Sequence, residues 1–165
     1  MRTFRVTKII EFDAGHRVPH HKSQCQNVHG HRYKLEATVE GPLIDVQGSS
    51  EEGMVVDFSD IKNVMMQQVH AVFDHVFIMS VDDPLKTLLP SPTAYVGGLA
   101  APLGHRYRIR DFGVVQEVPG VPTAENLAQW IFELLGNKIN NGSIQVTQVK
   151  LWETPNSAAT VAPLR

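Results

Sequence analysis

Two early segments of the chain alternate between apolar and polar residues, which is typical of half-buried β-strands. The first covers residues 3–13, and only Lys8 interrupts the parity of its apolar positions: Phe4, Val6, Ile10 and Phe12. The second covers residues 29–41, with apolar positions at Tyr33, Leu35, Ala37 and Val39. Residues 14–15, Ala-Gly, are expected to turn the chain, and the polar residues 17–28 to form a loop.

Two later segments have apolar residues at helical spacing. The first helix is expected to follow Asp57 as its N-cap and to run to about Phe73. Its apolar stripe consists of Phe58, Ile61, Met65, Val69 and Val72. The second helix is expected to follow Thr123 as its N-cap, to carry Glu125 in its first turn and to end at Gly136.

The last strands are expected at residues 144–153 and 158–161. Five prolines interrupt residues 80–121, an insert in which residues 105–110 and 114–118 are expected to form a small hairpin. The order strand-strand-helix-insert-helix-strand-strand favours an α+β fold, in which two helices cover one face of an antiparallel sheet.

The bulk properties narrow the functional classes. The 165 residues suit a single domain over residues 1–165, and the net charge of −2 has no long run of one sign, which argues against nucleic-acid binding. The chain opens with no apolar secretory segment and has no apolar stretch of membrane length, so we expect a cytoplasmic protein with no membrane partner. Cys25 is the only cysteine, which excludes an intrachain disulfide.

Three histidines are candidate metal ligands. His29 and His31 lie two residues apart on the apolar face of the second predicted strand, and His16 follows the first strand. An unpaired polar group on an apolar face is costly, and a metal ion would satisfy the imidazoles. Three imidazoles with an open position are typical of catalytic zinc, and imidazole also suits copper, iron and nickel. The alternative is a set of hydrogen-bonded core histidines.

Cys25 is a candidate catalytic residue. It lies in the polar loop before the second strand, among Gln24, Gln26 and Asn27, so we do not expect it in a core. A nearby metal or protonated histidine favours the thiolate, which would make Cys25 a base or a nucleophile. The alternatives are a fourth metal ligand and a bystander.

Three carboxylates are further candidates. Asp74 precedes His75 at the end of the first helix, where it would orient His75 as a general acid or base; the alternative is a histidine that interacts with the helix dipole. Glu153 ends an apolar strand and is either solvated or paired through both oxygens with an amino-pyrimidinone. Glu125 is either a charge at a helix N-terminus or a ligand contact. The remaining histidines are interpreted as surface or supporting residues: His20, His21, His70 and His105.

Six motifs occur in the order found in the 6-pyruvoyltetrahydropterin synthase / 6-carboxytetrahydropterin synthase family, which this chain resembles. They are Phe12-Asp13-Ala14-Gly15-His16-Arg17, Cys25-x3-His29-Gly30-His31, Gly53-Met54-Val55-Val56-Asp57-Phe58, Phe73-Asp74-His75, Pro122-Thr123-Ala124-Glu125-Asn126-Leu127-Ala128 and Trp152-Glu153-Thr154. The resemblance covers nearly the whole chain except the insert.

The resemblance implies a T-fold, a β-β-α-α-β-β unit whose sheets join into a barrel in a trimer, with two trimers stacked head to head as a hexamer. It implies Zn²⁺ bound by His16, His29 and His31. It also implies that Cys25 is the catalytic base and that Asp74 with His75 forms a proton relay. Glu153 would anchor a pterin ring, and Thr123 and Glu125 would line the same pocket. Because the pockets of this family lie at subunit interfaces, the relay would serve a neighbouring zinc site.

The gap of three residues between Cys25 and His29 is similar to that in the bacterial 6-carboxytetrahydropterin synthases of queuosine (7-deazapurine) synthesis. Animal-type pyruvoyl enzymes have a longer gap, and a folate-linked branch carries Glu near the cysteine position. The resemblance therefore implies 7,8-dihydroneopterin triphosphate as substrate, with 6-carboxytetrahydropterin, acetaldehyde and triphosphate as products. The alternatives are a 6-pyruvoyltetrahydropterin synthase, which leaves the carbon chain intact, and a non-catalytic pterin- or metal-binding module. A zinc hydrolase is disfavoured because its motifs are absent.

The insert is longer than a compact family member requires, and a lid, an oligomer contact and a specificity loop are all open as its role. Its alternating arginines either form a solvated basic edge strand or attract a triphosphate: Arg106, Arg108 and Arg110.

Overall fold

The computed structural model describes residues 2–95 and 103–163. Residues 96–102 of the expected insert lie outside the described residues. Within the described part, eight strands form one sheet in the order β4-β5-β6-β3-β1-β2-β7-β8. The strands are β1 (Phe4–His16), β2 (His29–Gly41), β3 (Val76–Ser80), β4 (Ala94–Tyr95), β5 (Arg106–Ile109), β6 (Gly113–Val118), β7 (Gln145–Thr154) and β8 (Ser157–Val161).

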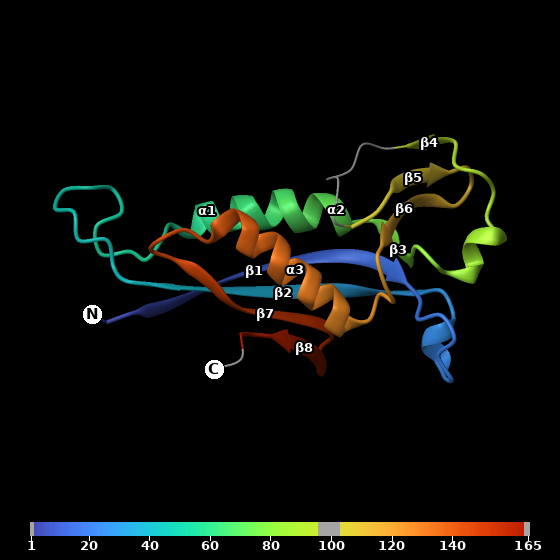
Figure 1. The fold of residues 1–165 in the computed structure, drawn as a ribbon, viewed down its shortest axis with the longest axis horizontal. Helices are drawn as coiled ribbons and strands as arrows, with labels where there is room; N and C mark the ends of the chain where they lie inside the picture. The colour runs from blue at the N-terminus through green and yellow to red at the C-terminus, as the bar shows by residue number, and fades with distance from the viewer. Residues whose placement is uncertain (1, 96–102, 164–165) are drawn as a thin grey trace.

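Two helical segments lie on one face of this sheet, as expected (Figure 1). The first consists of α1 (Phe58–Met65), a π-helical turn (Met66–His70) and α2 (Ala71–Phe73), and the second is α3 (Ala124–Ile139). The side chain of Asp57 caps α1 by accepting the Ser59 amide at 2.7 Å. The α1 and α3 helices contact each other, α1 packs on β1, and α3 packs on β7 and β8. The α+β arrangement expected from the sequence is therefore confirmed.

The alternation in β1 and β2 determines which residues face the helices. Every second residue from Ile10 to His16 is buried on that face, and the same is true from Tyr33 to Val39 in β2. These side chains form the main core with the apolar stripes of the helices. The opposite face of β1 and β2 carries charged and polar side chains, as the sequence pattern predicts.

The turn expected at Ala14 and Gly15 is wrong, because β1 continues to His16 and pairs in register with β2. Gly15 serves close packing instead of a turn. A Cβ atom there would lie 3.2 Å from the Phe77 ring and 3.3 Å from the carbonyl oxygen of His29. The lack of a side chain therefore lets β1 pass between β2 and β3.

The expected antiparallel sheet is wrong, because the sheet is mixed. The expectation failed since it did not include β3. β3 runs parallel to both β1 and β6. All five of its residues are buried. A strand that is buried on both faces has no polar alternation to reveal it.

The hairpin expected in the insert is confirmed as β5 and β6, with positive φ at Asp111 in the turn and at Gly113, the first residue of β6. A second core cluster packs β3 against this hairpin through Phe77, Met79, Tyr107, Ile109 and Val115. The insert is therefore an extension of the sheet. Its arginines do not form an edge strand, because β4 pairs with β5, and Arg110 lies in the turn beyond β5.

The end expected for the second helix at Gly136 is also wrong. The α3 helix continues to Ile139, and the Asn140 amide donates to the Gly136 carbonyl at 3.0 Å. A glycine inside a helix costs about 1 kcal/mol. Burial of Ile139 against the core, one turn after Leu135, offsets that cost.

Candidate active site

The three candidate metal ligands come together because of the β1–β2 register. His16 lies directly opposite His29, and Ala14 lies opposite His31, so the three imidazoles emerge on one face at the end of the ladder. Their ring centroids are 4.5 to 5.2 Å apart, and one ring nitrogen of each lies within 4.8 Å of the others. This grouping fits one shared metal ion.

Backbone carbonyls orient two of the rings. Nδ1 of His16 lies 2.7 Å from the carbonyl oxygen of Pro122, and Nδ1 of His29 lies 2.8 Å from that of Asn27. A carbonyl can only accept, so each Nδ1 carries the proton and each Nε2 keeps its lone pair. A carbonyl partner on the far nitrogen is the usual support of a metal-bound histidine.

Two ring nitrogens of the cluster, one on His16 and one on His31, have no hydrogen-bond partner unless a metal binds there. Nε2 of His16 and Nε2 of His31 are both buried and have no hydrogen-bond partner in the described structure. Oε1 of Glu153 lies 3.3 Å from the first and 3.8 Å from the second. Buried lone pairs without partners are rare in proteins. The three histidines therefore fit a metal ion that binds imidazole.

Electrostatics also favour metal binding. Burial is the main cause that lowers the pKa of His16 to about 4; the neighbouring His29 and His31 act in the same direction, and the Pro122 carbonyl opposes them. Burial likewise lowers the pKa of His31, with Glu153 opposing. Both rings are therefore neutral near pH 7, so their contacts with Glu153 are not ion pairs. Neutral imidazole is the form that binds metal.

This pKa predicts how the metal-free protein responds to acid. Above about pH 6.5, His16 is neutral in the folded and unfolded chains, so it adds no pH dependence. Between about pH 6.5 and pH 4 only the unfolded chain takes up the proton, so stability falls as the pH falls, by about 3 kcal/mol in total. Below that range both states are protonated and the loss stops.

Urea unfolding with a chelator present, at a fixed protein concentration, measures this loss. A His16→Gln variant should lose less stability over the same pH range, whereas His105→Gln, at an exposed position, should follow the wild type. Equal losses in the wild type and in His16→Gln would contradict the assignment.

A cavity of about 320 Å³ lies beside His16. Five of the residues selected from the sequence line it: His16, Cys25, Thr123, Glu125 and Glu153. Cys25 is exposed, in a 3₁₀ turn (Gln24–Gln26), as expected for a residue outside the core. The cavity therefore presents a thiol and carboxylates next to a metal-binding edge.

The capped start of α3 lines this cavity. The Thr123 hydroxyl accepts the Asn126 amide at 3.3 Å, which confirms its N-cap position. Glu125 stands in the first turn of the helix, where a negative charge is favourable. Glu153, near the end of β7, also lines a second hollow of about 600 Å³ with His31 and Trp152.

Asp74 and His75 form the predicted pair, but the pair lies outside the cavity that Cys25 lines. Oδ2 of Asp74 accepts from Nδ1 of His75 at 2.7 Å, and Oδ1 accepts the Asp13 amide at 3.0 Å. Burial raises the pKa of Asp74, but the Asp13 amide and the two neighbouring histidines, His70 and His75, outweigh it, so the pKa is lowered. The His75 side chain is 79% exposed, and its φ of 55° turns it out from the end of α2.

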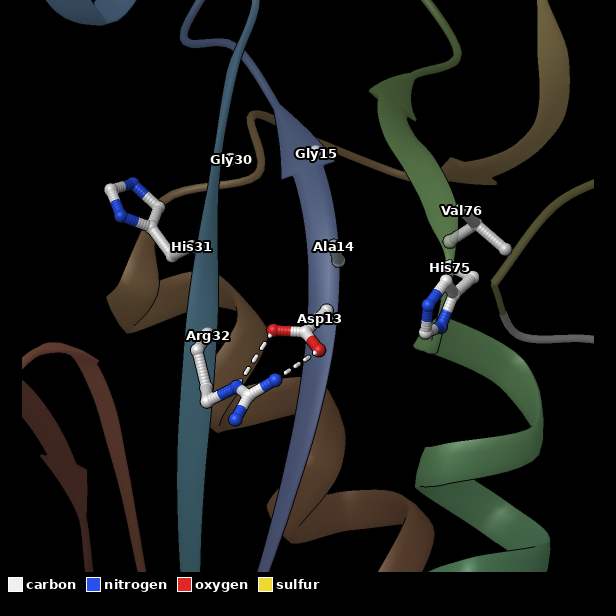
Figure 2. Close-up of a pocket in the computed structure, with 8 residues that line it drawn as sticks. All are labelled: Asp13, Ala14, Gly15, Gly30, His31, Arg32, His75 and Val76. Carbon is white, nitrogen blue, oxygen red and sulfur yellow. Dashed lines mark hydrogen bonds and ion pairs between the residues drawn. The ribbon is translucent and has the colours of Figure 1, made fainter.

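The pair lies by a shallow hollow of about 460 Å³ that His31 and His75 both line. Figure 2 shows the His31 ring beside β2 and the His75 ring beyond β1, next to the start of β3, with the ion pair of Asp13 and Arg32 between them. Neither Asp74 nor His75 lines the cavity of Cys25 within this chain.

Two residues near the site were not predicted as parts of it. His21 lines the same cavity as Cys25, and its Nδ1 accepts the Ser23 amide at 3.1 Å. The Tyr33 hydroxyl is buried beneath His16 and His31 without a partner in the described structure, and burial raises its pKa far above the usual value. The alternation of β2 marked Tyr33 only as a core position, and nothing in the sequence distinguishes His21 from a surface histidine.

The described residues contain no helix with the length and apolar character needed to cross a membrane.

Comparisons with known proteins identify the family of this chain. The sequence profile of the 6-pyruvoyl tetrahydropterin synthase family matches residues 5–163. Similar proteins include the 6-carboxy-5,6,7,8-tetrahydropterin synthases of Haemophilus influenzae, 30% identical over 93% of this chain and 95% of that protein, and Rickettsia bellii, 35% identical over 92% and 95%.

Solved structures show the same fold. An uncharacterized protein from Wolinella succinogenes superposes with a TM-score of 0.76 at 27% identity, over 99% of this chain and 100% of that one. The 6-pyruvoyl tetrahydropterin synthase of Caenorhabditis elegans superposes with a TM-score of 0.61 at 21% identity, over 99% and 98% of the two chains, which is a likeness of fold. The chain has the T-fold and belongs to the 6-pyruvoyl tetrahydropterin synthase family.

Proposed function

We propose that this protein is a zinc-dependent 6-carboxy-5,6,7,8-tetrahydropterin synthase of the queuosine (7-deazapurine) pathway. It would convert 7,8-dihydroneopterin triphosphate and one molecule of water to 6-carboxytetrahydropterin, acetaldehyde and triphosphate. The observation that carries the proposal is the pair of buried, unpartnered Nε2 atoms of His16 and His31, together with the position of His16 on the same cavity as Cys25. The names of the relatives from Haemophilus influenzae and Rickettsia bellii support the choice of reaction.

Zinc is the proposed metal because three neutral imidazoles with an open position are typical of its catalytic sites. His16, His29 and His31 would hold it. When bound, the ion would act as a Lewis acid toward oxygens of the substrate side chain. The carbonyl contacts of His16 and His29 keep both rings in the tautomer that this role requires.

Cys25 is the proposed base. Its loop brings the thiol to the wall of the cavity, where it would remove a proton from the substrate side chain as the thiolate. Loss of triphosphate and cleavage of one carbon–carbon bond then release the two-carbon fragment as acetaldehyde. Glu153, Thr123 and Glu125 would hold the pterin ring, with both oxygens of Glu153 accepting its adjacent N–H and NH₂ groups.

Asp74 and His75 are the proposed proton relay. Because Nδ1 of His75 donates to Asp74, its Nε2 is free to hold or pass a proton. The pair lies outside the Cys25 cavity of its own chain, so we propose that it serves the cavity of a neighbouring copy in a hexamer built from two trimers.

Asp74→Asn should lower kcat on the order of 100-fold with zinc still bound, since an amide at this position favours the wrong tautomer of His75. His70→Gln is the matched control, because His70 contacts the same carboxylate only at 3.7 Å and should cost little. Steady-state kinetics measure both. An unchanged kcat in Asp74→Asn would remove the pair from the mechanism.

Mixed oligomers test whether the relay acts between copies. Oligomers reassembled from equal amounts of the Cys25→Ala and Asp74→Asn chains should regain up to about a quarter of the wild-type activity, because some cavities then receive both intact groups. No recovery, with mixing verified by native mass spectrometry, would place the relay within one chain.

Release of acetaldehyde tests the proposed reaction. The zinc-loaded protein with 7,8-dihydroneopterin triphosphate should produce acetaldehyde and triphosphate in equal amounts, measured with a coupled alcohol dehydrogenase and a phosphate assay. Triphosphate without acetaldehyde would point to the 6-pyruvoyltetrahydropterin synthase reaction. Neither product, with zinc bound, would point to a non-catalytic pterin- or metal-binding module.

A further inference from the structure

The segment after β3 holds a buried carboxylate. The Asp83 side chain is 1% exposed. Its two oxygens accept from the guanidinium of Arg17 through three contacts of 2.7, 2.9 and 3.2 Å. This is a forked, charge-assisted interaction, which constrains both position and orientation.

The topology explains why these two residues meet. β1 and β3 run parallel, with His16 opposite Ile78, so the chain leaves both strands at the same edge of the sheet. Asp83 is also tied to its own segment, because Oδ1 accepts the Leu85 amide at 2.8 Å and thereby caps the 3₁₀ turn Pro84–Thr87. The contact with Leu85 therefore fixes the orientation of the Asp83 carboxylate that pairs with Arg17.

Arg17 also contacts the loop that carries Cys25. Its Nη1 lies 3.4 Å from the carbonyl oxygen of Gln26. The next residue, Val18, donates its amide to the carbonyl oxygen of Cys25 at 2.7 Å. These two contacts act on the two consecutive peptide groups that follow the Cα atom of Cys25.

The Cys25 loop has few other anchors. The turn Gln24–Gln26 contains no buried residue. A loop with so little buried surface depends on specific polar contacts for its conformation. Arg17, held by Asp83, supplies one such contact at the Gln26 carbonyl, although neither residue lines the cavity of Cys25.

We propose that Arg17 is a positioning residue that holds the Cys25 loop against the cavity, and that Asp83 of the insert is the anchor that holds Arg17. The proposal rests on the proposed function for the catalytic role of Cys25. The first part of the insert would then affect the reaction indirectly, because Asp83 would influence the position of Cys25 through Arg17 and the backbone of the loop.

Asp83→Asn tests the anchor, since the amide keeps the size of the side chain and can still cap Leu85 but lacks the charge. Hydrogen exchange in residues 17–28 should become about tenfold faster, with exchange in α3 unchanged. kcat should fall about 10- to 100-fold while KM stays within about twofold and zinc content is unchanged, because the base is misplaced and not removed. Arg17→Met combined with Asp83→Asn should be no worse than Arg17→Met alone.

Glu40→Gln is the matched control, because it alters another arginine pair, with Arg5, at the opposite end of the β1–β2 ladder. It should leave exchange in residues 17–28 and kcat unchanged. If Asp83→Asn does not fold, Arg17→Lys provides the same readouts, since it keeps the charge and loses the fork.

Exchange in residues 17–28 that does not change in the Asp83 or Arg17 variants would overturn the anchor, whether or not the wild type turns over substrate. Faster exchange with unchanged kcat would overturn the positioning role. A wild type without turnover would overturn the proposed function, while the exchange result would still decide the anchor.

Discussion

Replacement of Cys25 by alanine is expected to lower kcat about a thousandfold while the protein keeps its zinc, since a positioned general base contributes about 10²- to 10⁴-fold. The thiol lines the cavity but does not belong to the group of three imidazoles that could share a metal ion. Its removal should therefore affect the chemical step and leave the metal in place. Zinc content by mass spectrometry and steady-state kinetics measure the two effects separately.

Gln24→Ala is the matched control for this variant. Gln24 stands one residue before Cys25, in the same exposed turn, and its side chain does not line the cavity. Its loss should leave kcat nearly unchanged. Two outcomes would contradict the assigned role: loss of zinc from Cys25→Ala would make the cysteine a ligand, and an unchanged kcat would make it a bystander.

Replacement of His29 by asparagine is expected to weaken zinc binding on the order of 100-fold or more and to remove activity with it. His29 suits this test because it is only half-buried, so its replacement leaves the core beneath β1 and β2 intact. Circular dichroism should be unchanged. Excess zinc should restore part of the activity, because His16 and His31 remain.

His20→Asn is the matched control for the metal test. His20 is exposed and has a φ of 62°, a conformation that asparagine tolerates well. Zinc content and activity should both follow the wild type. Full zinc binding and full activity in His29→Asn would show that the cluster is not the metal site.

The parts of the fold with one buried and one exposed face could be predicted from the sequence. β2 has the expected bounds, and the N-caps Asp57 and Thr123 lie where the spacing predicts. β3 could not be predicted, because burial on both faces removes the polar positions that mark a strand. Glycine was the other source of error, since Gly15 serves close packing and Gly136 is accommodated within α3.

The site could be predicted as far as it depends on periodicity. The two-residue spacing of His29 and His31 is enough to place both rings on one face. The approach of Glu153 and the start of α3 depends on pairing between distant segments, which the sequence alone does not specify. The contact between Arg17 and Asp83 depends on β3, so it could not be foreseen once that strand was missed.

Mass spectrometry of the pterin product tests the central claim most directly. The zinc-loaded protein with 7,8-dihydroneopterin triphosphate should form 6-carboxytetrahydropterin, whereas the chelated protein and Cys25→Ala should form almost none. Pyruvoyltetrahydropterin as the main product would contradict the proposed cleavage of the carbon chain. Unchanged substrate, with zinc bound and the oligomer intact, would contradict the proposal that this family member is a pterin synthase.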